Sequence, residues 1–124
     1  MPRILVIDDD AMIRTLLRTV LEQEGYDVSE AINGADGLLQ YQATLPDLVI
    51  TDLQMPVMDG FQLLQELRRM VPPPAVIAIS GDQHTLSRAR ALTPHTFAKP
   101  LPLEQVLAAV RSLDLRHRSY DETA

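Results

Sequence analysis

The chain has 124 residues, a formal net charge of −6, a sequence pI near 4.9 and no cysteine. This length suits one domain with one core, and the negative charge argues against general binding to nucleic acid or anionic membranes. Disulfide frameworks and thiolate metal sites are excluded. The apolar runs are too short to span a membrane, and the N-terminus has no signal-peptide pattern, so we expect a cytoplasmic location.

Strand-like runs alternate with segments of helical spacing along the chain. A continuous apolar run at 4–7 predicts the first strand, and the apolar positions of 13–21 follow the period of a helix. Gly25 is expected to end this helix, because glycine tolerates left-handed backbone geometry. The partly polar run 26–31 predicts a second strand, which we expect at an edge of the sheet.

The middle of the chain repeats this alternation. Asn33 is expected to cap a second helix, whose apolar face is predicted to carry Ala35, Leu38 and Leu39. The continuous apolar run 48–52 predicts a strand covered by helices on both faces. The apolar positions of the third helix are Phe61, Leu64, Leu67 and Val71, and the prolines at 72–74 are expected to end it.

The last third contains two strands and two helices. Residues 75–80 predict the fourth strand, and Asp82 is expected to cap a short helix that reaches about Leu92. A brief strand at 96–98 precedes a final helix at 103–113, with Pro102 near its start. The polar segment 116–124 is expected to be a frayed tail after a domain at 1–115.

Five strands and five helices in strict alternation imply right-handed crossovers and an α/β fold, a three-layer sandwich around a parallel sheet. In such sheets, ligands bind at the carboxyl edge. Polar residues stand where four of the runs end, namely Asp8, Asp9, Asp10, Asp52, Ser80 and Lys99. Neighbouring carboxylates repel by up to about 4 kcal/mol per pair at ~4 Å and an effective dielectric near 20. A divalent cation would relieve this repulsion, and oxygen ligands suit Mg²⁺.

The segment Thr51-Asp-Leu-Gln-Met-Pro-Val-Met-Asp-Gly60 resembles the phosphoacceptor motif of bacterial two-component response-regulator receiver domains, the CheY-like family. The resemblance extends over residues 3–113 and includes the acidic cluster, Ser80-Gly81 and Lys99-Pro100. It implies a flavodoxin-like five-stranded sheet in the order 2-1-3-4-5. It also implies a cis peptide before Pro100.

The resemblance implies roles for the acidic residues. Asp52 would be the phosphorylated carboxylate, which agrees with the ability of carboxylates to act as nucleophiles toward phosphorus. Asp9 would bind Mg²⁺, or Mn²⁺ in its place, directly, and Asp8 through water. The backbone carbonyl of Gln54 would be a further ligand. Asp10 is better placed to cap the first helix, where the helix dipole favours a negative charge.

Other positions would handle the phosphoryl group and its signal. Lys99, the only lysine of the chain, would pair with Asp52 before phosphorylation and with a phosphoryl oxygen afterwards. The Ser80 hydroxyl would contact the phosphoryl group, besides capping the turn after its strand. Gln54 and Asp82 would tune the lifetime of the acyl phosphate. Thr96 stands where the family usually has an aromatic switch residue, so we expect a muted switch.

The leading functional hypothesis is a signalling switch that receives a phosphoryl group on Asp52 from a sensor histidine kinase or phosphotransfer protein. It would be no enzyme except toward its own phosphorylation and dephosphorylation. The residues after Leu113 are too few for a DNA-binding module. A complete chain would therefore signal through protein contacts or onward phosphotransfer, and a fragment through a fused output domain.

Two alternatives remain open. In a haloacid-dehalogenase-type phosphatase, Asp8-Asp9-Asp10 would supply the Asp-x-Asp of the active site, but Asp52 would have no role and a cap domain is missing. A pseudo-receiver would only bind partners, although the acidic cluster, Asp52, Ser80 and Lys99 are all present.

Overall fold

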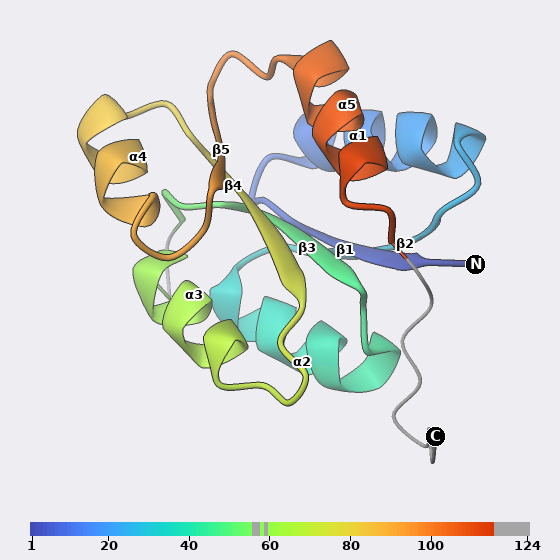
Figure 1. Cartoon of the computed structure of the whole chain (residues 1–124), viewed down its shortest axis with the longest axis horizontal. Helices are drawn as coiled ribbons and strands as arrows, with labels where there is room; N and C mark the ends of the chain where they lie inside the picture. The colour runs from blue at the N-terminus through green and yellow to red at the C-terminus, as the bar shows by residue number, and fades with distance from the viewer. Residues whose placement is uncertain (56–57, 59, 116–124) are drawn as a thin grey trace.

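The computed structural model describes residues 1–55, 58 and 60–115. Within them the chain alternates between strands and helices, as predicted (Figure 1). The elements are β1 (Arg3–Ile7), α1 (Ala11–Gln23), β2 (Asp27–Ala31), α2 (Gly34–Thr44), β3 (Leu48–Asp52), α3 (Gly60–Arg68), β4 (Ala75–Ser80), α4 (Gln83–Ala89), β5 (His95–Ala98) and α5 (Leu103–Ser112).

The strands form one parallel sheet in the order β2-β1-β3-β4-β5, which confirms the expected topology and places β2 at an edge. All five residues of β3 are buried, as its continuous apolar sequence predicted. The register pairs Ile7 of β1 with Thr51 of β3, and Ser80 of β4 with Ala98 of β5. The residues that follow these strands therefore meet along one edge of the sheet.

Helices cover both faces of the sheet (Figure 1). Helices α1 and α5 pack on one face, where Ile4 and Val6 of β1 meet Leu17 and Val106. On the other face, α2 and α3 cover Leu5 and Ile7, together with the other buried strand residues of that side. Helix α4 lies on this second face at the β4 side, where Ala89 packs against Ala78 and Leu64. The strand residues alternate between the two cores, as the pleat of a strand requires.

The termini of the helices confirm most of the predicted signals. Asp10, Asn33 and Asp82 each accept a hydrogen bond at the start of the helix that follows. Gly25, just after α1, has a φ of +95°, the left-handed geometry for which glycine is suited. The peptide bond between Lys99 and Pro100 is cis, as the family resemblance implied.

The predicted apolar face of α2 was wrong in part. Leu39 is 70% exposed, and the residues that α2 buries are Gly34, Gly37 and Tyr41. A Cβ atom at Gly37 would lie 2.5 Å from Cδ1 of Ile7, so a larger residue there would require the Ile7 side chain to shift. A search for large apolar side chains overlooks a helix face made by glycine.

Two predicted helix ends also differ. Val71 is 88% exposed and lies beyond α3, which ends at Arg68. The residue before a proline avoids helical geometry, which explains why Val71 does not extend α3. Helix α4 ends at Ala89 instead of near Leu92, and Leu92 and Thr93 form a turn in which their N–H groups donate to the Ala89 carbonyl.

The predicted frayed tail at 116–124 lies outside the described residues. None of the helices in the described part of the chain has the length and apolar character needed to cross a membrane.

Candidate functional site

Three carboxylates lie together at the carboxyl edge of the sheet. Asp8 follows β1, Asp9 follows Asp8, and Asp52 is the last residue of β3; one oxygen of each lies within 4.8 Å of the others. Asp8 and Asp52 are buried, at 2% and 4% exposure, whereas Asp9 is exposed. An all-oxygen set of clustered negative charges fits a hard divalent cation such as Mg²⁺ and not a soft metal.

The loop after β1 is held by hydrogen bonds that its backbone N–H groups donate. The Asp8 N–H donates to the Ala31 carbonyl (3.2 Å), and Asp8 Oδ1 accepts a hydrogen bond from the Asp10 N–H (2.9 Å). Asp10 Oδ1 in turn accepts from the Met12 N–H (2.9 Å), so its side chain serves the start of α1. Burial raises the pKa of the Asp8 carboxyl, although the hydrogen bond from Asp10 opposes this effect. Asp10 thus caps α1, whereas Asp8 and Asp9 of the same loop belong to the carboxylate cluster.

Lys99 supplies a positive charge to the cluster. Its Nζ lies 3.3 Å from Asp52 Oδ2 and 3.4 Å from Asp8 Oδ2. Burial by itself lowers the pKa of this ammonium group, but the charges of Asp52 and Asp8 outweigh it and raise the pKa. The Lys99 N–H donates to the Ser80 carbonyl (2.9 Å), which fixes the backbone from which the side chain extends. Lys99 is therefore held as an ammonium group between two buried carboxylates.

Ser80 ends β4 and is completely buried. Its Oγ accepts a hydrogen bond from the Asp82 N–H (3.1 Å), so the hydroxyl serves the turn, as its simpler predicted role required. Asp82 Oδ2 accepts hydrogen bonds from the Thr85 hydroxyl (2.6 Å) and N–H (3.0 Å), and these lower the pKa of Asp82. The Asp82 side chain is thus engaged at the start of α4.

The Gln54 side chain lies next to Gly81 beside the cluster. The Gln54 N–H donates to Asp52 Oδ1 (3.1 Å), which orients this carboxylate, and the Gln54 side chain is exposed. A Cβ atom added at Gly81 would lie 3.8 Å from Gln54 Oε1 and 4.0 Å from Lys99 Cβ, both ordinary contact distances. The absence of a side chain at Gly81 thus leaves free the position next to Gln54 and Lys99 that a Cβ atom would occupy.

The predicted switch position lies apart from the carboxylates. Thr96 is partly buried in β5 and pairs in register with Ala78 of β4. Phe97, its neighbour, packs against the core beneath α1 and α5. The two side chains thus lie on opposite faces of the sheet, as strand alternation predicted.

The sequence analysis missed Arg14. Its Nη1 donates to the Asp8 carbonyl (2.7 Å), and its Nε pairs with Glu30 Oε1 (3.1 Å). Arg14 occupies a polar position of α1, and nothing in the periodicity of the helix distinguishes it from a solvent-exposed arginine. The only local clue was that Arg14 lies one helical turn after Asp10, and so near the loop at the start of α1.

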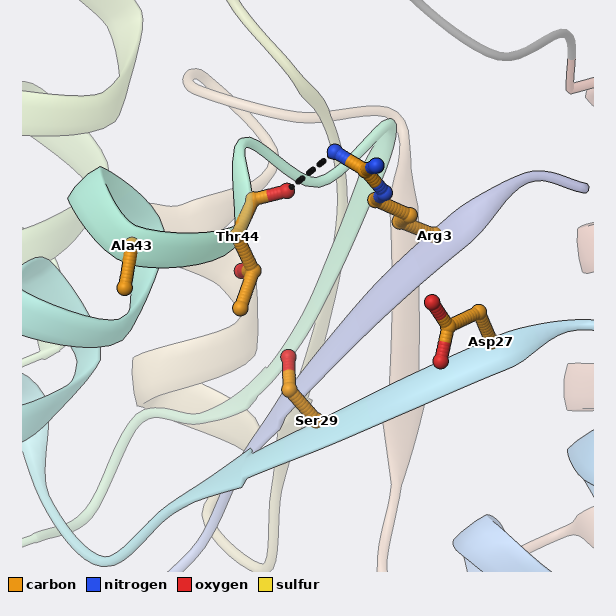
Figure 2. Close-up of a pocket in the computed structure, with 5 residues that line it drawn as sticks. All are labelled: Arg3, Asp27, Ser29, Ala43 and Thr44. Atoms are coloured by element: carbon orange, nitrogen blue, oxygen red, sulfur yellow. Dashed lines mark hydrogen bonds between the residues drawn. The ribbon is translucent and has the colours of Figure 1, made fainter.

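A polar hollow of about 240 Å³ lies at the opposite, amino edge of the sheet, beside the first residues of β1 and β2 (Figure 2). There Arg3 Nη1 donates to the Thr44 carbonyl (3.0 Å), and the hollow is lined by Arg3, Asp27, Ser29, Ala43 and Thr44. It contains none of the predicted site residues.

Comparisons with known proteins agree with the geometry. The family model described as the response regulator receiver domain matches residues 4–111. The chain is 37% identical over 118 residues to the DNA-binding dual master transcriptional regulator RpaA of Synechocystis, covering 91% of this chain and 49% of RpaA. It is 35% identical to the transcriptional regulatory protein PrrA of Mycobacterium leprae, covering 99% of this chain and 54% of PrrA. The chain thus spans about half the length of these curated relatives.

A solved structure of a response regulator has the same fold. The response regulator TrrA of Thermotoga maritima, crystallised with Mg²⁺ and BeF, superimposes with a TM-score of 0.83 at 31% identity, over 91% of this chain and 99% of TrrA. This likeness confirms the predicted flavodoxin-like arrangement of the sheet. Since the family model also covers nearly the whole described sequence, the chain belongs to the response regulator receiver domain family.

Proposed function

We propose that this receiver domain accepts a phosphoryl group on Asp52 in a Mg²⁺-dependent reaction. The observation that carries the proposal is the position of Asp52, buried between the carboxylates of Asp8 and Asp9 and the ammonium group of Lys99, which is 3.3 Å away. Asp9, Asp52 and the Gln54 carbonyl would hold the cation directly, and Asp8 through water. When bound, Mg²⁺ supplies positive charge that neutralises the phosphoryl oxygens.

The donor would be the phosphohistidine of a sensor kinase or phosphotransfer protein. A carboxylate oxygen of Asp52 attacks the phosphorus, the P–N bond breaks, and the imidazole nitrogen keeps the electron pair. Lys99 moves from Asp52 to a phosphoryl oxygen, and the Ser80 hydroxyl donates to another. Attack by water on the phosphorus later restores Asp52 and releases phosphate. The domain thus acts only on itself.

The output would depend on the rest of the protein. RpaA is named as a DNA-binding regulator and PrrA as a transcriptional regulatory protein, and each is about twice as long as the matched region. We propose a fused output domain that Asp52 phosphorylation controls through protein contacts. The predicted cytoplasmic location stays a prediction.

The phosphatase alternative has no support from the family assignment, because the matching model is the response regulator receiver domain. The pseudo-receiver alternative is opposed by the intact cluster of Asp8, Asp9 and Asp52 with Lys99. Turnover of p-nitrophenyl phosphate by the purified protein would revive the phosphatase alternative.

Intact-mass spectrometry after incubation with acetyl phosphate and Mg²⁺ tests the proposal. We expect one added phosphoryl group in the wild type and in Asp27→Asn, a control at the far edge of the sheet, and none in Asp52→Asn. Equal labelling of Asp52→Asn would show that another residue is the acceptor.

A further inference from the structure

Arg14 connects the acidic loop to a part of the fold that carries no phosphotransfer chemistry. Its side chain is 15% exposed, and its guanidinium group spans two partners, the Asp8 carbonyl at 2.7 Å and the Glu30 carboxylate at 3.1 Å. Asp8 follows β1, whereas Glu30 belongs to the neighbouring strand β2. A planar guanidinium with donors fixed in a fork can bridge two such acceptors, which the single ammonium group of a lysine does less well.

Glu30 is itself fixed from a second side. Arg18, one turn further along α1, donates from Nη1 to Glu30 Oε2 (2.8 Å). The hydrogen bonds from Arg18 and then Arg14 lower the pKa of Glu30, so this carboxylate stays ionised at neutral pH. The backbone of Arg14 is therefore fixed by α1, and its guanidinium group by the charged Glu30 side chain on β2. The same guanidinium group holds the Asp8 carbonyl.

The Asp8 carbonyl belongs to the peptide group that leads into Asp9. No described residue donates a hydrogen bond to the Asp9 carboxylate, and Asp9 is exposed, so among these contacts only the backbone constrains it, by setting the position and direction of its Cα–Cβ bond. The N–H of Asp8 is fixed by Ala31, and its side chain by the Asp10 N–H. The hydrogen bond from Arg14 adds the remaining constraint, on the plane of the Asp8–Asp9 peptide.

We propose that Arg14 is a positioning residue of the cation site: by holding the Asp8 carbonyl, it fixes the direction in which Asp9 presents its carboxylate. The inference rests on the proposed function, because it assigns Arg14 to the site at which Asp9 would bind Mg²⁺. Arg14 touches neither the cation nor the phosphoryl group, and acts through the backbone of the loop.

The test measures Mg²⁺ affinity by isothermal titration calorimetry and phosphorylation by acetyl phosphate across a Mg²⁺ series. Partners that orient metal ligands typically contribute 10- to 100-fold in affinity, so we expect Arg14→Met to weaken Mg²⁺ binding by about tenfold. At saturating Mg²⁺, its phosphorylation rate should return to that of the wild type. Arg14→Lys should recover part of the affinity, because it restores one of the two contacts.

Arg18→Met is the matched control, since Arg18 shares Glu30 and α1 with Arg14 but does not contact the acidic loop. We expect its Mg²⁺ affinity to stay well above that of Arg14→Met and close to that of the wild type, because Arg14 still contacts both Glu30 and the Asp8 carbonyl. In metal-free buffer, hydrogen exchange of the Asp10 amide should be faster in Arg14→Met than in Arg18→Met. If circular dichroism shows that Arg14→Met is unfolded, the affinities of Arg14→Lys and Glu30→Gln test the positioning role instead. We expect each of them to lose less Mg²⁺ affinity than the tenfold given for Arg14→Met.

Wild-type affinity in a folded Arg14→Met, or an equal loss in Arg18→Met, would overturn the positioning role and leave the proposed function intact. A wild-type domain that binds no Mg²⁺ would instead contradict the proposed function. The hydrogen-exchange comparison needs no metal and would still show whether Arg14 orders the loop.

Discussion

The ammonium group of Lys99 and the carboxylate of Asp52 form an ion pair with 3.3 Å between Nζ and Oδ2, although 47 residues separate them in the chain. The Asp52 side chain is 4% exposed and that of Lys99 26%, so the pair is shielded from most solvent screening. Asp8 Oδ2 shares the same ammonium group at 3.4 Å. One cation therefore balances two buried carboxylates.

Removing this charge should destabilise the metal-free domain. Lys99→Met leaves Asp8 and Asp52 without their counter-charge, and we expect a loss of roughly 1–3 kcal/mol in the free energy of unfolding. Urea unfolding in metal-free buffer measures it, and added Mg²⁺ should recover part of the loss. Arg69→Met, which removes an exposed ion pair with Glu66, should cost less than about 1 kcal/mol. Equal losses in the two variants would contradict the view that Lys99 balances buried charge.

Asp9 should contribute far more to cation binding than Asp10. Asp9 belongs to the carboxylate cluster, whereas Asp10 caps α1 through the Met12 N–H. We expect Asp9→Ala to weaken Mg²⁺ binding by roughly tenfold or more. Asp10→Ala should instead lower the thermal stability, since loss of a helix cap costs about 1 kcal/mol. Calorimetric titration and thermal melts of both variants check this, and the reverse order of affinities would mean that the loop was assigned incorrectly.

The ion pairs of Glu30 should make part of the stability depend on pH. Arg18 and Arg14 lower the pKa of Glu30 from its ordinary value of 4.5, so the folded state favours the ionised form. The resulting stability is present above pH 4.5 and is lost as the pH falls through the lowered pKa. We expect Glu30→Gln to cost up to about 1 kcal/mol at neutral pH, because the pair is partly exposed. The difference from the wild type should vanish in acid, and a pH-independent difference would argue against a charge effect.

Gln54 and Asp82 should influence the lifetime of the acyl phosphate. The Gln54 side chain is exposed and lies next to Gly81, and the Gln54 N–H donates to Asp52 Oδ1, so this side chain can meet a water that attacks the acyl phosphate. Gln54→Ala should therefore change the dephosphorylation rate more than the rate of phosphotransfer. Asp82→Ala should do the same, and should also loosen α4, because Asp82 accepts two hydrogen bonds from Thr85. Decay of the phosphorylated mass over time measures both rates, and unchanged decay in both variants would refute the assignment.

Signal transmission through β5 should be weak. Thr96 is too small to fill the space of an aromatic residue, and Phe97 is held in the opposite core. Phosphorylation adds roughly −1.5 to −2 charge beside Ser80 and Lys99. Hydrogen exchange with and without beryllofluoride should change in the loop after Ser80 and in α4, with little change across 96–107.

The variant Thr96→Tyr provides the comparison for this experiment. It supplies the aromatic side chain and should extend the protected region into β5. Strong protection across 96–107 in the wild type would show that the strand couples without an aromatic residue.

The sequence predicted the backbone better than the contacts between distant side chains. Three helix caps and the meeting of Asp8, Asp52 and Lys99 follow from local periodicity and from the geometry of parallel sheets, whereas the strand order was implied by the family resemblance. Arg14 could not be predicted, because its partners are set by the packing of α1 against β2. Likewise, α2 buries Gly37 beside Ile7 and leaves Leu39 exposed, a choice of face that no helical period of large apolar residues reveals.

The topology of the sheet has a consequence for synthesis. Asp8 and Lys99 are 91 residues apart, and every strand pair is parallel, so the cluster and its counter-charge come together only through long crossovers. Contacts of such high sequence separation form slowly, and a nascent chain leaves the ribosome from its N-terminus. The acidic loop and Asp52 therefore emerge well before the lysine that neutralises them. Only the completely folded domain would then accept a phosphoryl group, so a kinase would not modify chains that are still being made.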